Sequence, residues 1–220
     1  MGKDIETFIA KLDLFCDKSF EVASKHREEG RIDGLAFYYF GRCVSCFMGV
    51  KTLLFSLNLA GSQKDFAEQY INSFPKTFPR RDVTIAEKYI KETHMAIRFV
   101  LFQNFYSQTE FTYRIIQREK LPGKERRNPF KLISETYNIL DGGIPEFLND
   151  IRNSIHNNGH YFPDDKTDWE YTYFGKTFKF IQGKTINDVT MQDILTIVDY
   201  VLDENIKLFE IKELAEIKFE

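Results

Sequence analysis

Apolar side chains recur at intervals of three and four residues through most of this 220-residue chain. This spacing places them on one face of an α-helix, so the chain is predicted to bury them by packing helix against helix. Residues 34–60 are apolar on nearly all sides, which is typical of a central helix with several neighbours. The predicted long helices cover residues 4–28, 34–60, 83–119 and 190–219, and shorter ones cover 62–74, 129–140 and 145–157.

Residues that begin or end helices divide these segments. Gly61 is expected to end the second long helix, and Ser62 to cap the short helix that follows it. Thr109 can cap a second segment, so the third long helix is a candidate for a break at residues 107–109. Asn158-Gly159 is expected to supply a left-handed cap at the end of the helix over 145–157.

One segment has a different period. Trp169, Tyr171 and Tyr173 alternate with polar residues, the next residues can turn, and Phe178 and Phe180 alternate again. This period of two predicts a β-hairpin. The expected fold is all-α: a multi-helix bundle of long antiparallel helices in a single domain, with a small β-hairpin inserted before the last helix.

Composition and charge narrow the functional classes. An apolar fraction of 43% with 22 Phe and 11 Tyr supplies one substantial core. The net charge of -3 gives no general attraction to nucleic acid or acidic membranes, so a polyanion would have to bind a local patch. No window has the length and apolarity of a membrane span, and the first residues do not resemble a signal peptide. A soluble, cytoplasmic protein without a membrane partner is expected.

Three cysteines, Cys16, Cys43 and Cys46, lie inside apolar helical patterns. Their odd number argues against a secreted disulfide scaffold. Cys43 and Cys46 have the CxxC spacing, but they lie within a helix and have no second ligand pair. They are therefore predicted to be buried thiols, and no metal or cofactor is implied.

Polar side chains that can take part in binding or catalysis gather at residues 152–159, where a predicted helix ends. Arg152 and His156 are four residues apart, so guanidinium and imidazole share one face. A fixed cation beside a group that exchanges a proton near neutral pH suits a phosphodiester. The alternative is that both are ordinary last-turn cations beside a helix cap. His156 and His160 are disfavoured as a metal pair, because the helix ends between them and no third ligand is evident.

A second polar pair lies on the long helix over 83–119. Glu110 and Arg114 are four residues apart, the spacing of a surface ion pair. The alternative is that they orient Arg152. The densest basic run, residues 118–131, is interpreted as a solvated loop rather than an RNA contact, because Glu119 and Glu125 dilute it.

At residues 152–156 the chain resembles the HEPN superfamily of small helical-bundle proteins, which includes toxin, abortive-infection and CRISPR-associated ribonucleases. The resemblance rests on Arg152-Asn153 followed by His156 late in a helix of a mostly helical chain. It implies that His156 acts on the ribose 2′-hydroxyl or the leaving oxygen, while Arg152 and Asn153 hold the phosphate. It also implies a homodimer. Three residues separate Arg152 from His156 here, whereas the family pattern has four to six.

The first hypothesis is therefore a metal-independent endoribonuclease acting in a toxin or phage-defence setting. Its catalytic residues are Arg152 and His156, and the supporting residues are Asn153, Asn157, Glu110 and Arg114. The second hypothesis is a non-catalytic HEPN-like dimeric module that binds RNA, nucleotide or a protein partner such as an antitoxin. A third, outside the family, is a helical interaction protein in which the Arg-His pair only caps a helix.

Overall fold

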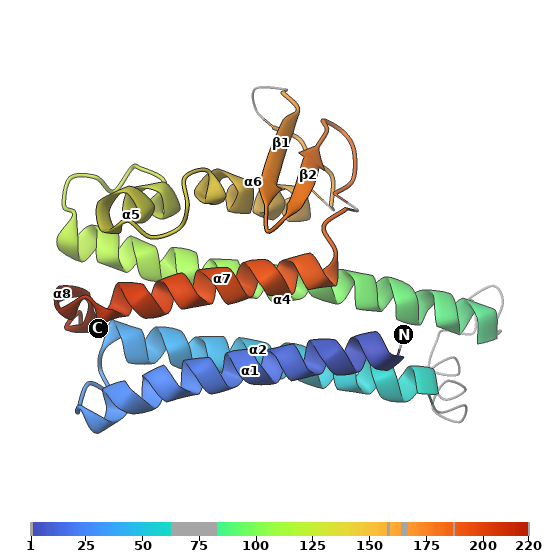
Figure 1. The fold of residues 1–220 in the computed structure, drawn as a ribbon, viewed down its shortest axis with the longest axis horizontal. Coiled ribbons are helices and arrows are strands. Elements are labelled where there is room, and N and C mark those ends of the chain that lie inside the picture. The colour runs from blue at the N-terminus through green and yellow to red at the C-terminus, as the bar shows by residue number, and fades with distance from the viewer. Residues whose placement is uncertain (1, 63–82, 158, 164–166, 187, 220) are drawn as a thin grey trace.

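The computed structural model describes residues 2–62, 83–157, 159–163, 167–186 and 188–219 (Figure 1). The described helices are α1 (Gly2–Glu28), α2 (Leu35–Ser62), α4 (Val83–Lys120), α5 (Pro129–Tyr137), α6 (Ile144–His156), α7 (Met191–Glu210) and α8 (Lys212–Ala215). Strands β1 (Trp169–Tyr173) and β2 (Lys176–Phe180) form an antiparallel hairpin. The predicted all-α class with one inserted hairpin is confirmed.

The long helices lie side by side, with α5, α6 and the hairpin on one side of α4 and α7 (Figure 1). Helix α1 packs on α2, α2 on α4, and α7 on both α1 and α4. Aromatic rings fill the space between them. The Phe47 ring lies 5.4 Å from that of Phe15 on α1 and 5.9 Å from that of Phe105 on α4. The phenylalanine-rich composition is thus used to join helices through one continuous core.

Several predicted boundaries are wrong. Helix α2 continues through Gly61 to Ser62, so Gly61 does not end it. The short helix expected over 62–74, with its cap at Ser62, lies outside the described residues apart from Ser62 itself. Helix α5 ends at Tyr137 rather than at residue 140, because Asn138 adopts the left-handed conformation with φ of 54°.

Helix α4 is continuous where a break was considered. The Thr109 hydroxyl donates to the Phe105 carbonyl at 3.0 Å within the same helix, and it lies 3.1 Å from the Tyr39 hydroxyl of α2. A threonine that bonds back to its own helix satisfies its hydroxyl without capping a new segment. The result is one helix of 38 residues that contacts α2, α5, α6 and α7.

The helix predicted over 190–219 is divided in two. Ile211 is extended, with φ of -69° and ψ of 111°, and only the short α8 follows. The chain then reaches the turn between α1 and α2, where the Leu35 amide donates to the Ile217 carbonyl at 2.8 Å. The Phe219 amide donates to the Asp33 carbonyl at 2.6 Å. The Phe219 ring also stacks on Tyr38 with centroids 3.9 Å apart. Ile217 and Phe219 thus hold the turn that connects α1 and α2.

A buried polar network joins α2, α4 and α7. Asn205 is fully buried, and its amide nitrogen donates to the Tyr39 hydroxyl at 2.8 Å. Its amide oxygen accepts from the Tyr113 hydroxyl at 2.7 Å. Thr109 completes the network through its contact with Tyr39. Both ends of the Asn205 amide are therefore satisfied inside the core, which fixes the register of three helices.

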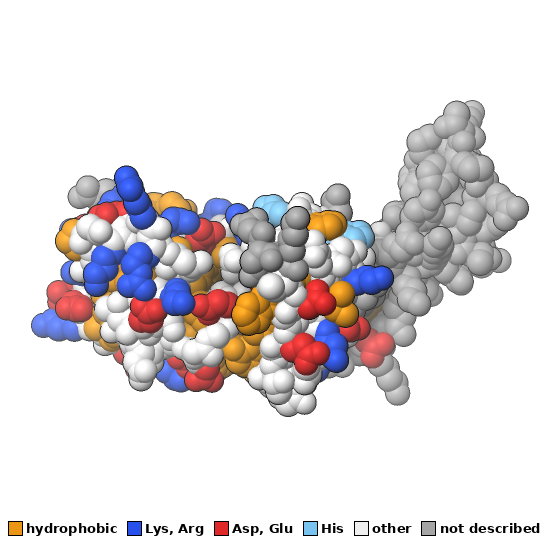
Figure 2. Space-filling model, turned by 90° about the horizontal axis from the view of Figure 1, so that it is seen from above, with side chains coloured by type: hydrophobic (Ala, Val, Ile, Leu, Met, Phe, Trp, Pro, Cys, Tyr) orange, Lys and Arg blue, Asp and Glu red, His pale blue; other side chains and the backbone are white. Residues whose placement is uncertain are grey.

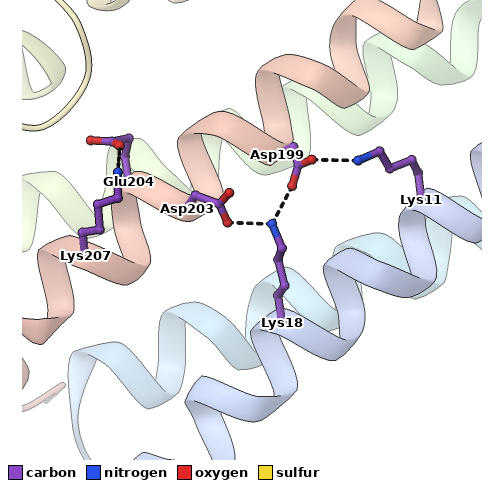
Figure 3. Close-up of polar contacts among 6 residues, drawn as sticks. All are labelled: Lys11, Lys18, Asp199, Asp203, Glu204 and Lys207. Atoms are coloured by element: carbon purple, nitrogen blue, oxygen red, sulfur yellow. Dashed lines mark hydrogen bonds and ion pairs between the residues drawn. The ribbon is translucent and has the colours of Figure 1, made fainter.

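Ion pairs hold α7 against α1 at the surface (Figure 3). Lys11 and Lys18 each lie 2.8 Å from Asp199, and Lys18 also lies 2.7 Å from Asp203. Burial by itself would raise the pKa of Asp199, but the hydrogen bonds from the two lysines outweigh it and hold that pKa below its usual value. Figure 3 also shows the separate pair of Glu204 and Lys207 within α7.

The cysteines are buried or half-buried free thiols, as predicted. Burial raises the pKa of Cys46 to about 12 and raises that of Cys43 further. Because the thiolate is the reactive form, these cysteines are poor nucleophiles. No helix in the described part of the chain is long and apolar enough to cross a membrane.

His26 makes folding stability depend on pH. Its ring is 4% exposed in a groove between α1 and α7, and its Nδ1 has no hydrogen-bond partner among the described residues. Burial lowers the pKa of His26, and the nearby Arg31 and Lys25 lower it further. Below about pH 6.5 the unfolded chain therefore takes up a proton that the folded chain resists, and the free energy of unfolding decreases as the pH falls.

We expect His26→Gln to flatten this dependence. The measurement is urea unfolding of both proteins at about pH 7.5 and about pH 5.5, where the wild type should lose more stability than the variant. Equal losses would show that His26 does not contribute.

Candidate functional site

Helix α6 is held in place by its apolar stripe, which packs under the hairpin. The Phe147 ring lies 5.3 Å from the rings of Tyr171 and Tyr173 and 5.0 Å from that of Phe178. Gly143 is the residue just before the helix, with φ of 91°, and a Cβ there would collide with the Tyr173 hydroxyl. The hairpin thereby fixes how α6 presents its polar residues.

Helix α6 runs antiparallel to α4. At its end, Gly159 lies against the Phe99 ring, which a Cβ on the glycine would meet at 3.8 Å. Further back, Arg152 is close enough to Tyr106 for its charge to act on the phenol. The second half of α6 and the residues just after it therefore lie along the part of α4 between residues 99 and 106.

Arg152 is half-buried at this contact. Its Nη1 donates to the Asn153 Oδ1 at 3.0 Å, while its Nε is buried and has no partner among the described residues. Gln103 of α4 also has a buried Oε1 without a partner. Leaving such an atom unpaired costs about 1–3 kcal/mol, so unpaired polar atoms are rare unless a site uses them.

The neighbouring α4 residues form a polar row. Gln103, Glu110 and Arg114 are spaced by seven and four residues, so they share a face, and Tyr106 lies beside them. Burial raises the pKa of Tyr106 and Glu110 raises it further, while Arg152 and Arg114 oppose this. The phenol is thus neutral and can donate a hydrogen bond.

The predicted ion pair between Glu110 and Arg114 is present, with Arg114 Nη2 at 2.6 Å from Glu110 Oε1. The described hydrogen bond of the Arg152 side chain goes to Asn153 instead. The charges of Glu110, Arg114 and Arg152 thus all act on the Tyr106 phenol. The described contacts include no hydrogen bond from Glu110 or Arg114 to Arg152.

His156 is the last residue of α6, and its side chain is exposed. Asn157, also exposed, caps the helix: its backbone N–H donates to the carbonyls of Asn153 and Ser154, both at 3.1 Å. Gly159 has φ of 84°, the predicted left-handed conformation, and its amide donates to the Ser154 carbonyl at 2.8 Å. Asn158 lies outside the described residues. The capping geometry exists, and it leaves the imidazole of His156 accessible.

The basic run at residues 118–131 lies over α5 and the loop before it, where Lys and Arg side chains gather in Figure 2. Three of these cations are paired with carboxylates: Arg118 with Glu119 at 2.9 Å, Arg127 with Glu135 at 2.6 Å and Lys131 with Glu146 at 3.1 Å. This pairing weakens the attraction that the run would have for RNA.

Tyr106, which lies near Arg152, was not predicted from the sequence, and neither was Gln103 with its buried Oε1. The signal available was their helical spacing from Glu110 and Arg114, but nothing local linked them to Arg152.

His160 is bridged to Thr185 in extended backbone, away from the helical geometry that a pair with His156 would use. Among the described residues, no group of three or more His, Cys, Asp or Glu side chains is placed to hold a metal ion.

Comparison with known proteins adds no relative: no family model, no curated protein and no solved structure matches this chain.

Proposed function

We propose that this chain is a HEPN-like, metal-independent endoribonuclease whose site is the polar face of α6. The observation that carries the proposal is the placement of Arg152. Its guanidinium is half-buried near Tyr106 of α4, its Nε has no partner among the described residues, and it lies one helical turn before the exposed imidazole of His156. A preorganised cation beside an accessible proton carrier is what cleavage of a phosphodiester requires.

In the proposed reaction, the ribose 2′-oxygen attacks the phosphorus and the bond to the 5′-oxygen breaks. His156 accepts the proton of the 2′-hydroxyl or donates one to the departing 5′-oxygen. Arg152 and Asn153 bind the non-bridging oxygens, where negative charge increases in the transition state. The products are a 2′,3′-cyclic phosphate and a 5′-hydroxyl, and the reaction needs no metal.

A homodimer would bring two copies of this site together, so that one imidazole acts as base and the other as acid. Twofold symmetry places identical surfaces opposite one another, which makes such a composite site possible. Dimerisation stays a proposal, and light scattering at micromolar concentration tests it.

The second candidate is a non-catalytic dimeric module that uses the same surface to bind RNA, nucleotide or a protein partner such as an antitoxin. The observation that favours it is the spacing of Arg152 and His156, which is shorter than in the family pattern. Binding needs the guanidinium but no proton transfer.

The test is incubation of the purified protein with end-labelled RNA in excess EDTA. We expect cleavage that leaves 2′,3′-cyclic phosphate ends, and none at positions with 2′-deoxyribose. A His156→Ala preparation purified in parallel controls for contaminating ribonuclease. RNA that is bound but not cleaved would overturn the proposal in favour of the second candidate, and RNA that is neither bound nor cleaved would remove both RNA roles.

A further inference from the structure

The C-terminal segment (residues 211–219) borders a groove that contains a buried histidine. The groove has a volume of about 560 Å³ and lies between α1 and α7, and its walls include His26 of α1 together with Lys212 and Ala215 of α8. His26 is only 4% exposed, so its ring lies inside the groove rather than at the rim. We propose that His26 and the C-terminal segment form a pH-sensitive latch, in which protonation of the imidazole releases the segment from the turn between α1 and α2.

A proton added to His26 is poorly accommodated in this groove. An imidazolium donates a hydrogen bond from both ring nitrogens, but Nδ1 of His26 is buried and has no partner among the described residues. Burial lowers the pKa of His26, and the positive charges of Arg31 and Lys25 lower it further. The imidazolium therefore gains its missing hydrogen bond only when the groove opens to water.

The carboxylates that line the groove are either paired or exposed. Asp203 of α7 pairs with Lys18 at 2.7 Å, and Glu29 of α1 pairs with Arg31. The other charged side chains of the groove are exposed: Glu21 and Lys25 on α1, Glu210 on α7 and Lys212 on α8. Water screens charges at such positions, so they stabilise an imidazolium inside the groove only weakly.

The groove is held more firmly at one end than at the other. At one end, Asp199 and Asp203 of α7 form ion pairs with two lysines of α1 (Figure 3). At the other end, α8 has only four residues and begins at Ile211 without a side-chain cap. A helix of one turn is weakly stabilised by its own hydrogen bonds. The groove is therefore expected to open at α8 and the residues that follow it.

The turn to which the C-terminal segment is attached begins at His26. The Arg31 amide donates to the His26 carbonyl at 2.8 Å. Gly34 then brings the turn close to the segment, since a Cβ there would meet the Ala215 carbonyl at 3.9 Å. The residues on either side of Gly34 make the backbone hydrogen bonds to the segment. A His26 ring that moves toward water therefore disturbs the same turn that holds the segment.

Hydrogen exchange followed by NMR tests the latch at single amides. The amides of Leu35 and Phe219 donate the bonds between turn and segment. Between about pH 7.5 and about pH 5.5 we expect their protection factors, corrected for intrinsic exchange, to fall about 10-fold. This is the proton uptake of an imidazole that has its ordinary pKa of about 6.5 in the open form and stays neutral in the closed form. His26→Gln should abolish the change, and His156→Gln, which replaces an exposed histidine, should retain it.

Urea distinguishes release of the segment from unfolding of the whole chain, and this measurement needs only the wild type. Local opening exposes little surface, so exchange at Leu35 and Phe219 should hardly respond to urea below the unfolding transition. Exchange at Tyr113, in the core of α4, should respond steeply. Protection at Leu35 and Phe219 that matches Tyr113 in size and urea dependence would overturn the latch. So would protection that is independent of pH, or that changes equally in His26→Gln.

Discussion

Replacement of His156 by alanine is expected to slow RNA cleavage by about 10²- to 10⁴-fold, the usual contribution of a positioned general acid or base. The imidazole is exposed at the end of α6, so the substitution should change neither the fold nor the midpoint of urea unfolding appreciably. Single-turnover cleavage with saturating enzyme isolates the chemical step from binding.

Two substitutions of Arg152 test, in the same assay, whether its guanidinium stabilises the transition state. Arg152→Ala removes a transition-state donor and is expected to cost about 10²- to 10³-fold. Arg152→Lys keeps the charge but loses the planar, forked donors, so it should restore only part of the rate. Arg42→Ala, an exposed arginine on α2, is the matched control and should cleave as the wild type does. If His156→Ala and Arg152→Ala cleave as fast as Arg42→Ala, these residues are not catalytic.

The largest expected effect on stability belongs to Asn205. Asn205→Leu leaves the buried Tyr113 hydroxyl without its acceptor and removes the donor to Tyr39, both inside the core. Uncompensated buried polar groups predict a loss of about 2–5 kcal/mol in the free energy of unfolding. Urea denaturation measures this loss, and Asn104→Leu, at an exposed position of α4, is the matched control.

A double-mutant cycle tests the mechanism of that loss. If the network carries the effect, Tyr113→Phe should recover part of the stability lost in Asn205→Leu, because it removes the stranded hydroxyl. Simple addition of the two losses would instead show that they arise from independent packing defects.

The periodicity of the chain predicts the helices and the hairpin because apolar spacing directly reflects which face is buried. It fails where a contact from elsewhere decides the outcome. Thr109 has the residue type of a cap, yet its hydroxyl is used by Phe105 and Tyr39. Asn205 would be assigned to a solvated face, yet two tyrosines from other helices satisfy it in the core.

The candidate site shows the same limit. Arg152, Asn153 and His156 form a contiguous motif whose spacing can be read from the chain. Tyr106 precedes it by about fifty residues and lies near it only because α6 packs antiparallel to α4, which no local pattern encodes. The exposed rings of Phe162 and Trp169 were likewise indistinguishable in the sequence from core aromatics.

The backbone bonds from Ile217 and Phe219 to the turn between α1 and α2 set an order for assembly during translation. The first two helices leave the ribosome long before the segment that secures their connection exists, so Asp33 and Leu35 must wait for these partners until every intervening element has been synthesised. Contacts between such distant parts of a chain form slowly. The turn between α1 and α2 therefore gains these backbone bonds only after α7 and α8 have been made.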